Sequence, residues 1–150
     1  MKILISCKAI SISITLYLIS FNAMADWVKI IEKTDEASSA IYVETTTFGW
    51  GGGMAQVWTL ENYDLPRIHE SRKYISVKQF REFGCHDKTY RMNFQNGFDG
   101  KMLTGYSQWT NSSVDFEKVE AGSTNESIMN FACKISKERA SRGYSIQSRQ

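Results

Sequence analysis

An apolar segment at the N-terminus is followed by short runs in which apolar and polar residues alternate. β-Branched and aromatic residues are frequent in these runs, and turn-forming residues separate them, as is typical of strands joined by turns. The pattern predicts strands at residues 26–32, 40–44, 54–63, 74–85, 89–94 and 102–109. Residues 64–73 are strongly polar and predict a solvated loop, and the glycine-rich residues 45–53 predict a connection between strands.

The run at residues 74–85 predicts the central strand of the sheet. Side chains alternate along a strand, so Val77, Phe83 and Cys85 fall on one face and Phe80 falls on the other. With apolar side chains on both faces, this strand is expected in the interior of the sheet.

A single helix is predicted near the C-terminus. Ser123 and Glu126 have the spacing of a capping box, in which the serine accepts a hydrogen bond from the first turn and the glutamate reaches back. An apolar stripe with helical spacing follows, and Cys133 lies on its flank. Strands followed by one helix predict an α+β domain with an antiparallel sheet. The residues of the stripe are Ile128, Phe131, Ala132 and Ile135.

The N-terminus has the pattern of a signal peptide. A basic start at Lys2 precedes a largely apolar segment at residues 9–21, and Ala23 and Ala25 are the small residues expected before a cleavage site. The predicted organisation is a signal peptide at 1–25, a domain at 26–139 and a loose polar tail at 140–150. A retained membrane anchor is the alternative, but the apolar run is shorter than the ~20 residues of a spanning helix.

Export predicts a periplasmic or secreted protein, with the cell surface as a further location. Cys7 follows residues that resemble a lipidation box, but no apolar segment precedes it, so no lipid anchor is expected. The chain has 18 Lys and Arg against 16 Asp and Glu, and the leader removes Lys2 and Lys8. The mature chain is therefore neutral, which argues against nucleic acid as a partner.

Two cysteines remain after cleavage, Cys85 and Cys133. In an oxidising compartment this pair predicts one disulfide between the central strand and the helix. The alternative is a reactive thiol activated by His69 or His86, although nothing else in the sequence positions such a pair.

No motif for catalysis or for a metal is present. Carboxylates are scattered, and His69 and His86 lack the spacing of a metal site, so we expect no enzyme, no metal and no cofactor. Trp50, within the glycine-rich connection, is instead a candidate contact residue for a partner. The chain is also rich in Trp and Tyr, which either cover a thin core or face a protein partner.

The mature region up to the helix resembles the surface-adhesin protein E family of small exported proteobacterial proteins. The resemblance rests on the order and spacing of short matches over residues 26–133. They are Asp26-Trp27, Ile41-Tyr42-Val43-Glu44, Val57-Trp58-Thr59-Leu60 with Tyr63, Ser76-Val77-Lys78, Glu82-Phe83-Gly84-Cys85, Tyr90-Arg91, Gly100, Trp109, Gly122-Ser123 and Cys133.

The resemblance implies a twisted antiparallel sheet of about six strands, with the C-terminal helix docked on one face by a Cys85–Cys133 bridge. It also implies a protein without enzymatic activity. In the best-known member the domain is a dimeric surface lipoprotein that binds host proteins such as vitronectin and laminin, so a homodimer is a further expectation.

Together these features predict a non-enzymatic, exported, adhesin-like binding domain whose partner is a protein or a component of the cell envelope. The alternative is a periplasmic inhibitor or accessory protein that presents its sheet or residues 48–53 to an envelope enzyme.

Overall fold

The computed structural model describes residues 26–33, 39–46, 48–112 and 115–142. The predicted signal peptide and residues 143–150 of the predicted tail lie outside this part of the chain. No helix within it is long and apolar enough to cross a bilayer.

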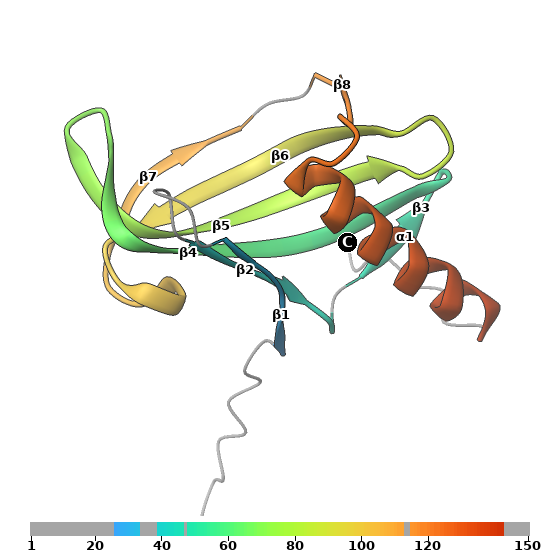
Figure 1. The fold of residues 1–150 in the computed structure, drawn as a ribbon, viewed down its shortest axis with the longest axis horizontal. Helices are drawn as coiled ribbons and strands as arrows, with labels where there is room; N and C mark the ends of the chain where they lie inside the picture. Colours follow the sequence, from blue (N-terminus) through green and yellow to red (C-terminus); the bar gives the residue numbers. More distant parts are fainter. Residues whose placement is uncertain (1–25, 34–38, 47, 113–114, 143–150) are drawn as a thin grey trace, which may run out of the picture.

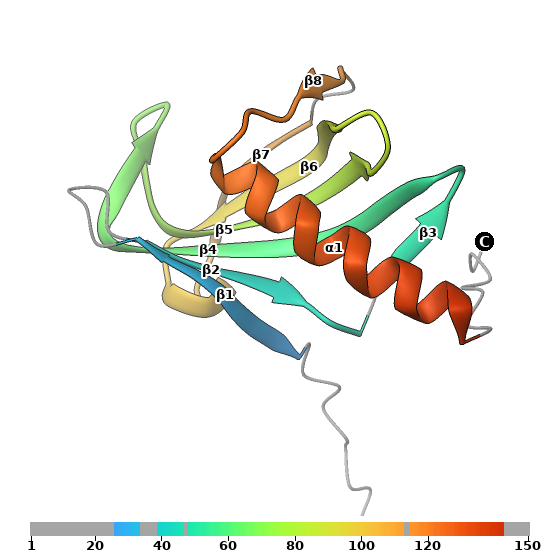
Figure 2. The same cartoon turned by 45° about the vertical axis from the view of Figure 1, so that its right-hand side comes forward.

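The described residues form one antiparallel sheet and one α-helix (Figures 1 and 2). The elements are β1 (Trp27–Lys33), β2 (Ser39–Glu44), β3 (Gly49–Gly51), β4 (Met54–His69), β5 (Arg72–Gly84), β6 (Thr89–Phe98), η1 (Lys101–Leu103), β7 (Ser107–Asn111), β8 (Glu117–Lys118) and α1 (Thr124–Ser141). The main strands follow the order β1-β2-β4-β5-β6-β7, while β3 pairs with β4 and β8 with β6. This arrangement confirms the predicted α+β class, with β3 and β8 as strands that the pattern did not predict.

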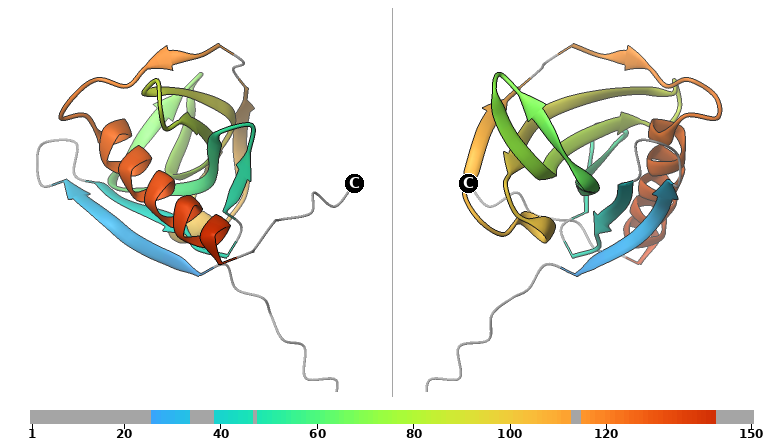
Figure 3. Two further views of the ribbon diagram at one scale, coloured as in Figure 1. Left: turned by 90° about the vertical axis from the view of Figure 1, so that its right-hand side faces the viewer. Right: turned by 60° about the vertical axis from the view of Figure 1, so that its left-hand side comes forward.

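The sheet is curved when viewed end-on, and α1 lies on one of its faces (Figure 3). We call this the helix face and the opposite one the outer face. β5 pairs with β4 on one side and β6 on the other, so the predicted central strand is interior. The core lies between the helix face and α1, and its fully buried sheet residues include Ile41, Val43, Ala55, Val57 and Phe83.

The helix begins at the predicted cap. The amide of Glu126 donates to Ser123 Oγ at 3.1 Å, and the carboxylate of Glu126 accepts from the amide of Gly122 at 2.7 Å. The first bond satisfies an amide of the first turn, which has no partner within the helix, and the second ties the residue before the cap to that turn.

The buried side of α1 is turned relative to the predicted stripe. Ile128 and Ala132 are fully buried, but Phe131 is only partly buried, whereas Met129 and Cys133 are buried in the core. A disulfide explains this rotation, because it draws Cys133 from the flank of the stripe toward the end of β5.

That disulfide joins Cys85 and Cys133, whose Cα atoms are 5.9 Å apart. It confirms the predicted bridge and removes the alternative of a reactive thiol, because both sulfurs are consumed by the bond. Cys85 directly follows the last residue of β5, so the disulfide closes the core with a covalent link at this end of the strand.

The loop predicted at residues 64–73 is wrong: β4 and β5 continue through it as a hairpin. His69 packs on Trp109 of β7 with ring centroids 4.5 Å apart, and Tyr74 packs on the same indole at 5.4 Å. These contacts join residues far apart in sequence, so local polarity gave no sign of them. The only proline, Pro66, falls where the register shifts between Asn62 and Arg67, a position at which its missing N–H costs no ladder bond.

The strand predicted at residues 102–109 begins later than expected, at Ser107. Its first part is η1, in which Met102 and Leu103 both have positive φ. Two buried side chains on the outer face hold this backbone: the amide of Met102 donates to Asn62 Oδ1 at 2.9 Å, and that of Leu103 donates to Ser76 Oγ at 3.1 Å. These bonds stabilise a conformation that residues other than glycine rarely adopt.

We expect removal of the disulfide in the double variant C85A/C133A to lower the free energy of unfolding by about 2–4 kcal/mol. The bond closes a separation of 48 residues, and its loss restores conformational entropy to the unfolded chain. Denaturant unfolding of oxidised wild type, reduced wild type and the variant measures the effect. Equal stability of oxidised and reduced wild type would contradict it.

The turn at the tip of the β4–β5 hairpin predicts a stabilising variant. Glu70 and Ser71 have φ of 47° and 69°, the geometry for which Asn-Gly is the preferred pair. We expect E70N/S71G to raise the free energy of unfolding by about 1–2 kcal/mol, because it relieves strain at both positions. The matched control is E138N/S141G on the exposed side of α1, which should destabilise the helix.

Candidate functional site

A row of aromatic side chains crosses the outer face of the sheet. Trp58 on β4 pairs in register with Phe80 on β5, which pairs with Phe94 on β6. The rings of Trp58 and Phe80 lie 5.0 Å apart between centroids, and those of Trp58 and Phe94 lie 6.0 Å apart. All three are only partly buried, and α1 packs on the other face, so we call this row the aromatic face.

A cation lies over this row. Lys78 Nζ is 4.3 Å from the centroid of the Trp58 ring, within the range of a cation–π interaction. Leu60, the register partner of Lys78, lies beside it on the same face and is fully buried. The surface thus combines an apolar base with aromatic and cationic groups at the solvent boundary.

A buried carboxylate orders the polar side of the aromatic face. Glu82 Oε1 accepts from Gln56 Nε2 at 2.6 Å, and Oε2 accepts from Arg91 Nε. Burial alone would raise the pKa of Glu82, but hydrogen bonds from Asn93, Arg91 and Gln56 outweigh it and hold the pKa below its ordinary value. The network therefore keeps a negative charge inside the sheet surface at neutral pH.

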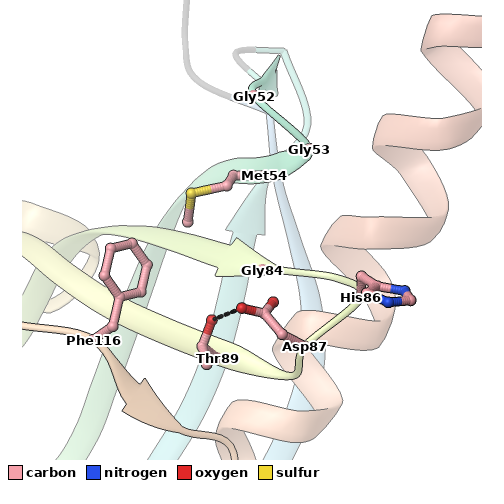
Figure 4. Close-up of a pocket in the computed structure, with 8 residues that line it drawn as sticks. All are labelled: Gly52, Gly53, Met54, Gly84, His86, Asp87, Thr89 and Phe116. Carbon is pink, nitrogen blue, oxygen red and sulfur yellow. Dashed lines mark hydrogen bonds between the residues drawn. The ribbon is translucent and has the colours of Figure 1, made fainter.

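A pocket of about 550 Å³ adjoins the network (Figure 4). The side chains of Met54 and Phe116 form its apolar walls, and Asp87 accepts a hydrogen bond from Thr89 at 3.2 Å. Gly84 belongs to its floor, where a Cβ atom would collide with the side chains of Asp87 and Thr89. The lining residues are Gly52, Gly53, Met54, Gly84, His86, Asp87, Thr89 and Phe116.

Arg91 connects the pocket to the aromatic face. Its guanidinium lies 4.6 Å from the centroid of the Phe116 ring and also bonds Glu82. An apolar recess with one carboxylate, beside aromatic and cationic side chains, is suited to receive a side chain from a partner. His86, the histidine of the pocket, bonds none of the other lining residues in the described part of the chain.

The structure does not bring Trp50 to this surface. Trp50 pairs with Ala55, whose side chain faces the helix core, so it lies on the helix side of the edge strand β3. Its side chain is 41% exposed, which keeps it available as a separate contact residue.

The two histidines lie at opposite ends of β5. His69 is at the hairpin tip against Trp109, while His86 lines the pocket. Within the described ranges, no group of three or more His, Cys, Asp or Glu could hold a metal ion.

The aromatic face was missed by sequence reasoning. Alternation placed Phe80 away from the core side of its strand, which was the one available signal. Which residues of β4 and β6 lie beside Phe80 depends on register, and the shift between Phe80 and Arg81 in the β5–β6 pairing has no mark in the sequence.

The low pKa of Glu82 predicts how stability responds to acid. Ionised Glu82 stabilises the fold above its ordinary pKa of 4.5, and this contribution is lost as the pH falls through the lower pKa of the folded state. We expect Glu82→Gln to cost about 1–3 kcal/mol at neutral pH. The difference from wild type should shrink below about pH 4.5. Urea unfolding at a series of pH values tests this, and Glu138→Gln, at an exposed position of α1, is the control. Parallel curves of unfolding free energy against pH for wild type and Glu82→Gln would contradict the prediction.

Comparison of the chain with known proteins identifies its family. The family model described as surface-adhesin protein E matches residues 27–134. Among solved structures, Haemophilus influenzae protein E is similar, with a TM-score of 0.58 at 11% identity over 77% of this chain and 90% of that chain. Protein E from non-typeable Haemophilus influenzae gives a TM-score of 0.53 at 11% identity, covering 85% of each chain. No curated protein matches the chain significantly.

At 11% identity the two structures show a shared fold and no more. The family match covers well over half of the sequence and is independent of the fold. Proteins of this family are surface adhesins and not enzymes, which confirms the prediction of a non-enzymatic protein and supports a surface or exported location. The chain therefore belongs to the surface-adhesin protein E family.

Proposed function

We propose that this adhesin-like protein recognises a protein partner through the aromatic face and the adjoining pocket. The observation on which this rests is the row of Trp58, Phe80 and Phe94, left partly exposed on a face opposite the helix. A core of aromatic and arginine side chains is the composition that concentrates binding energy in protein interfaces.

The pocket gives this surface a means of selection. Met54 and Phe116 offer apolar contact, and the carboxylate of Asp87 lies beside them. A partner side chain with an apolar stem and a donor group at its end satisfies both. Because Gly84 contributes backbone and no side chain, the recess stays open to such a group.

The alternative is a periplasmic inhibitor or accessory protein, and the exposed indole of Trp50 is the observation that favours it. A single Trp on a short edge strand is suited to entering a cleft of another protein. The two functions use opposite faces of the sheet, so variants separate them.

The experiment is binding of the purified protein to immobilised laminin and vitronectin, the ligands of the best-known member of the family that the sequence resembles. We expect F116A/K78E to weaken binding at least about tenfold, because it removes a pocket wall and reverses the charge over Trp58. Trp50→Ala should bind as wild type does. Both substituted residues of the double variant lie at the solvent boundary, and circular dichroism checks the fold.

Other outcomes assign the function differently. Loss of binding in Trp50→Ala alone would move the contact to β3. Absence of wild-type binding to both ligands, together with fractionation of the protein to the periplasm, would favour the accessory function. The homodimer stays a prediction, which sedimentation of the same samples measures.

A further inference from the structure

Exposed apolar side chains gather at the end of the sheet away from the pocket. Leu65 and Ile68, near the tip of the β4–β5 hairpin, are 71% and 68% exposed, and Tyr106, just before β7, is 81% exposed. They are the three most exposed of the large hydrophobic residues in the described part of the chain. We call residues 64–73 together with Tyr106 the hairpin end; the hairpin is the green arm at the left of Figure 1.

The hairpin end is held rigidly in place. The tilted ring contact of His69 with Trp109 joins the hairpin to β7, and Arg72 Nη1 donates to the carbonyl of Gln108 at 2.6 Å, two residues beyond Tyr106. Lys101 of η1 pairs with Asp64 at 3.3 Å. Leu65 and Ile68 are therefore presented to solvent by a fixed support.

The hairpin end and the residues that contact it carry one more cation than carboxylates. Arg67, Arg72 and Lys73 lie on the hairpin beside Glu70. Two carboxylates complete the set: Asp64 pairs with Lys101 at 3.3 Å, and Asp99 accepts from the amide of Tyr106 at 2.8 Å and from Gln108 Nε2 at 3.0 Å, neutral donors that leave its charge in place. With Lys101 included, four cations stand against three carboxylates. Because the mature chain is neutral overall, a positive end gives the molecule a preferred orientation toward an anionic surface.

We propose that the hairpin end docks on the surface of an anionic lipid bilayer. Leu65 and Ile68 enter between the headgroups, Tyr106 lies at the interface, and Arg67, Arg72 and Lys73 contact lipid phosphates. Aliphatic tips with basic residues beside them are the arrangement that binds bilayer surfaces, and tyrosine is enriched at the level of the headgroups.

The shape of the hairpin end favours a bilayer over a protein. A stable protein interface buries about 800 Å² on each partner, which needs a broad surface. Here the exposed aliphatic residues are on a two-stranded tip that projects from the sheet (Figures 1 and 3). A bilayer accepts a few projecting side chains without a complementary surface. The docking site lies at the opposite end of β5 from the pocket and is independent of the proposed protein partner.

Vesicle co-sedimentation of the full chain, purified after export, tests the proposal. We expect binding to vesicles of phosphatidylcholine mixed with phosphatidylglycerol, weaker binding to phosphatidylcholine alone, and a decrease with added salt. L65D/I68D should lower the affinity at least about tenfold, because it removes both inserted side chains. Val28→Asp, at an exposed apolar position on β1, is the matched control and should bind as wild type does.

A second measurement reports insertion directly. Leu65→Trp adds an indole at the tip, and its fluorescence should shift to shorter wavelength on adding anionic vesicles, whereas Val28→Trp should show no added shift. Thermal unfolding checks the fold of every variant. Absence of vesicle binding by wild type, equal binding by folded L65D/I68D, or no shift in Leu65→Trp would overturn the proposal. So would loss of laminin or vitronectin binding in L65D/I68D with vesicle binding intact, which would make the tip a protein contact.

Discussion

The bond between Cys85 and Cys133 determines which face of the sheet is covered. It joins the end of the central strand to the middle of the only α-helix in the described chain, so α1 must lie over the side of β5 that carries Phe83. Two further contacts hold the ends of the helix. Arg81 bonds Asn125 in its first turn, and Arg139 near its last turn bonds the carbonyl of Thr45. The helix is thereby fixed along its length to one face.

Because α1 covers only the helix face of the sheet, the outer face must be stabilised by other contacts. On the outer face, tilted and edge-on ring contacts and the hydrogen-bonded carboxylate of Glu82 take the place of a second layer. Aromatic and arginine side chains can do this while still in contact with water, because each has an apolar body and a polar group or edge. The same property suits them to binding, so the stabilisation of this face and its proposed function have one physical origin.

The helix cap and the central strand could be predicted because each is determined by a short local pattern, and the disulfide could be predicted because few cysteines are present. Ser123 and Glu126 are three residues apart, and Cys85 and Cys133 are the only two cysteines that follow the predicted leader. The hairpin at residues 64–73 could not be predicted, because its support is Trp109, which lies some 40 residues further along the chain. The aromatic face and the position of Trp50 depend on strand register, which alternation alone does not give.

The two proposed contact sites are connected by continuous strands. β5 has 13 residues and runs from the hairpin tip to the floor of the pocket, so at 3.3 Å per residue the sites are separated by at most roughly 40 Å. Paired on both sides by β4 and β6, this strand keeps the separation constant. A molecule docked by its hairpin end would therefore hold the pocket away from the bilayer, on the side from which a protein partner approaches. Because the two sites share no residue, binding at one leaves the other accessible.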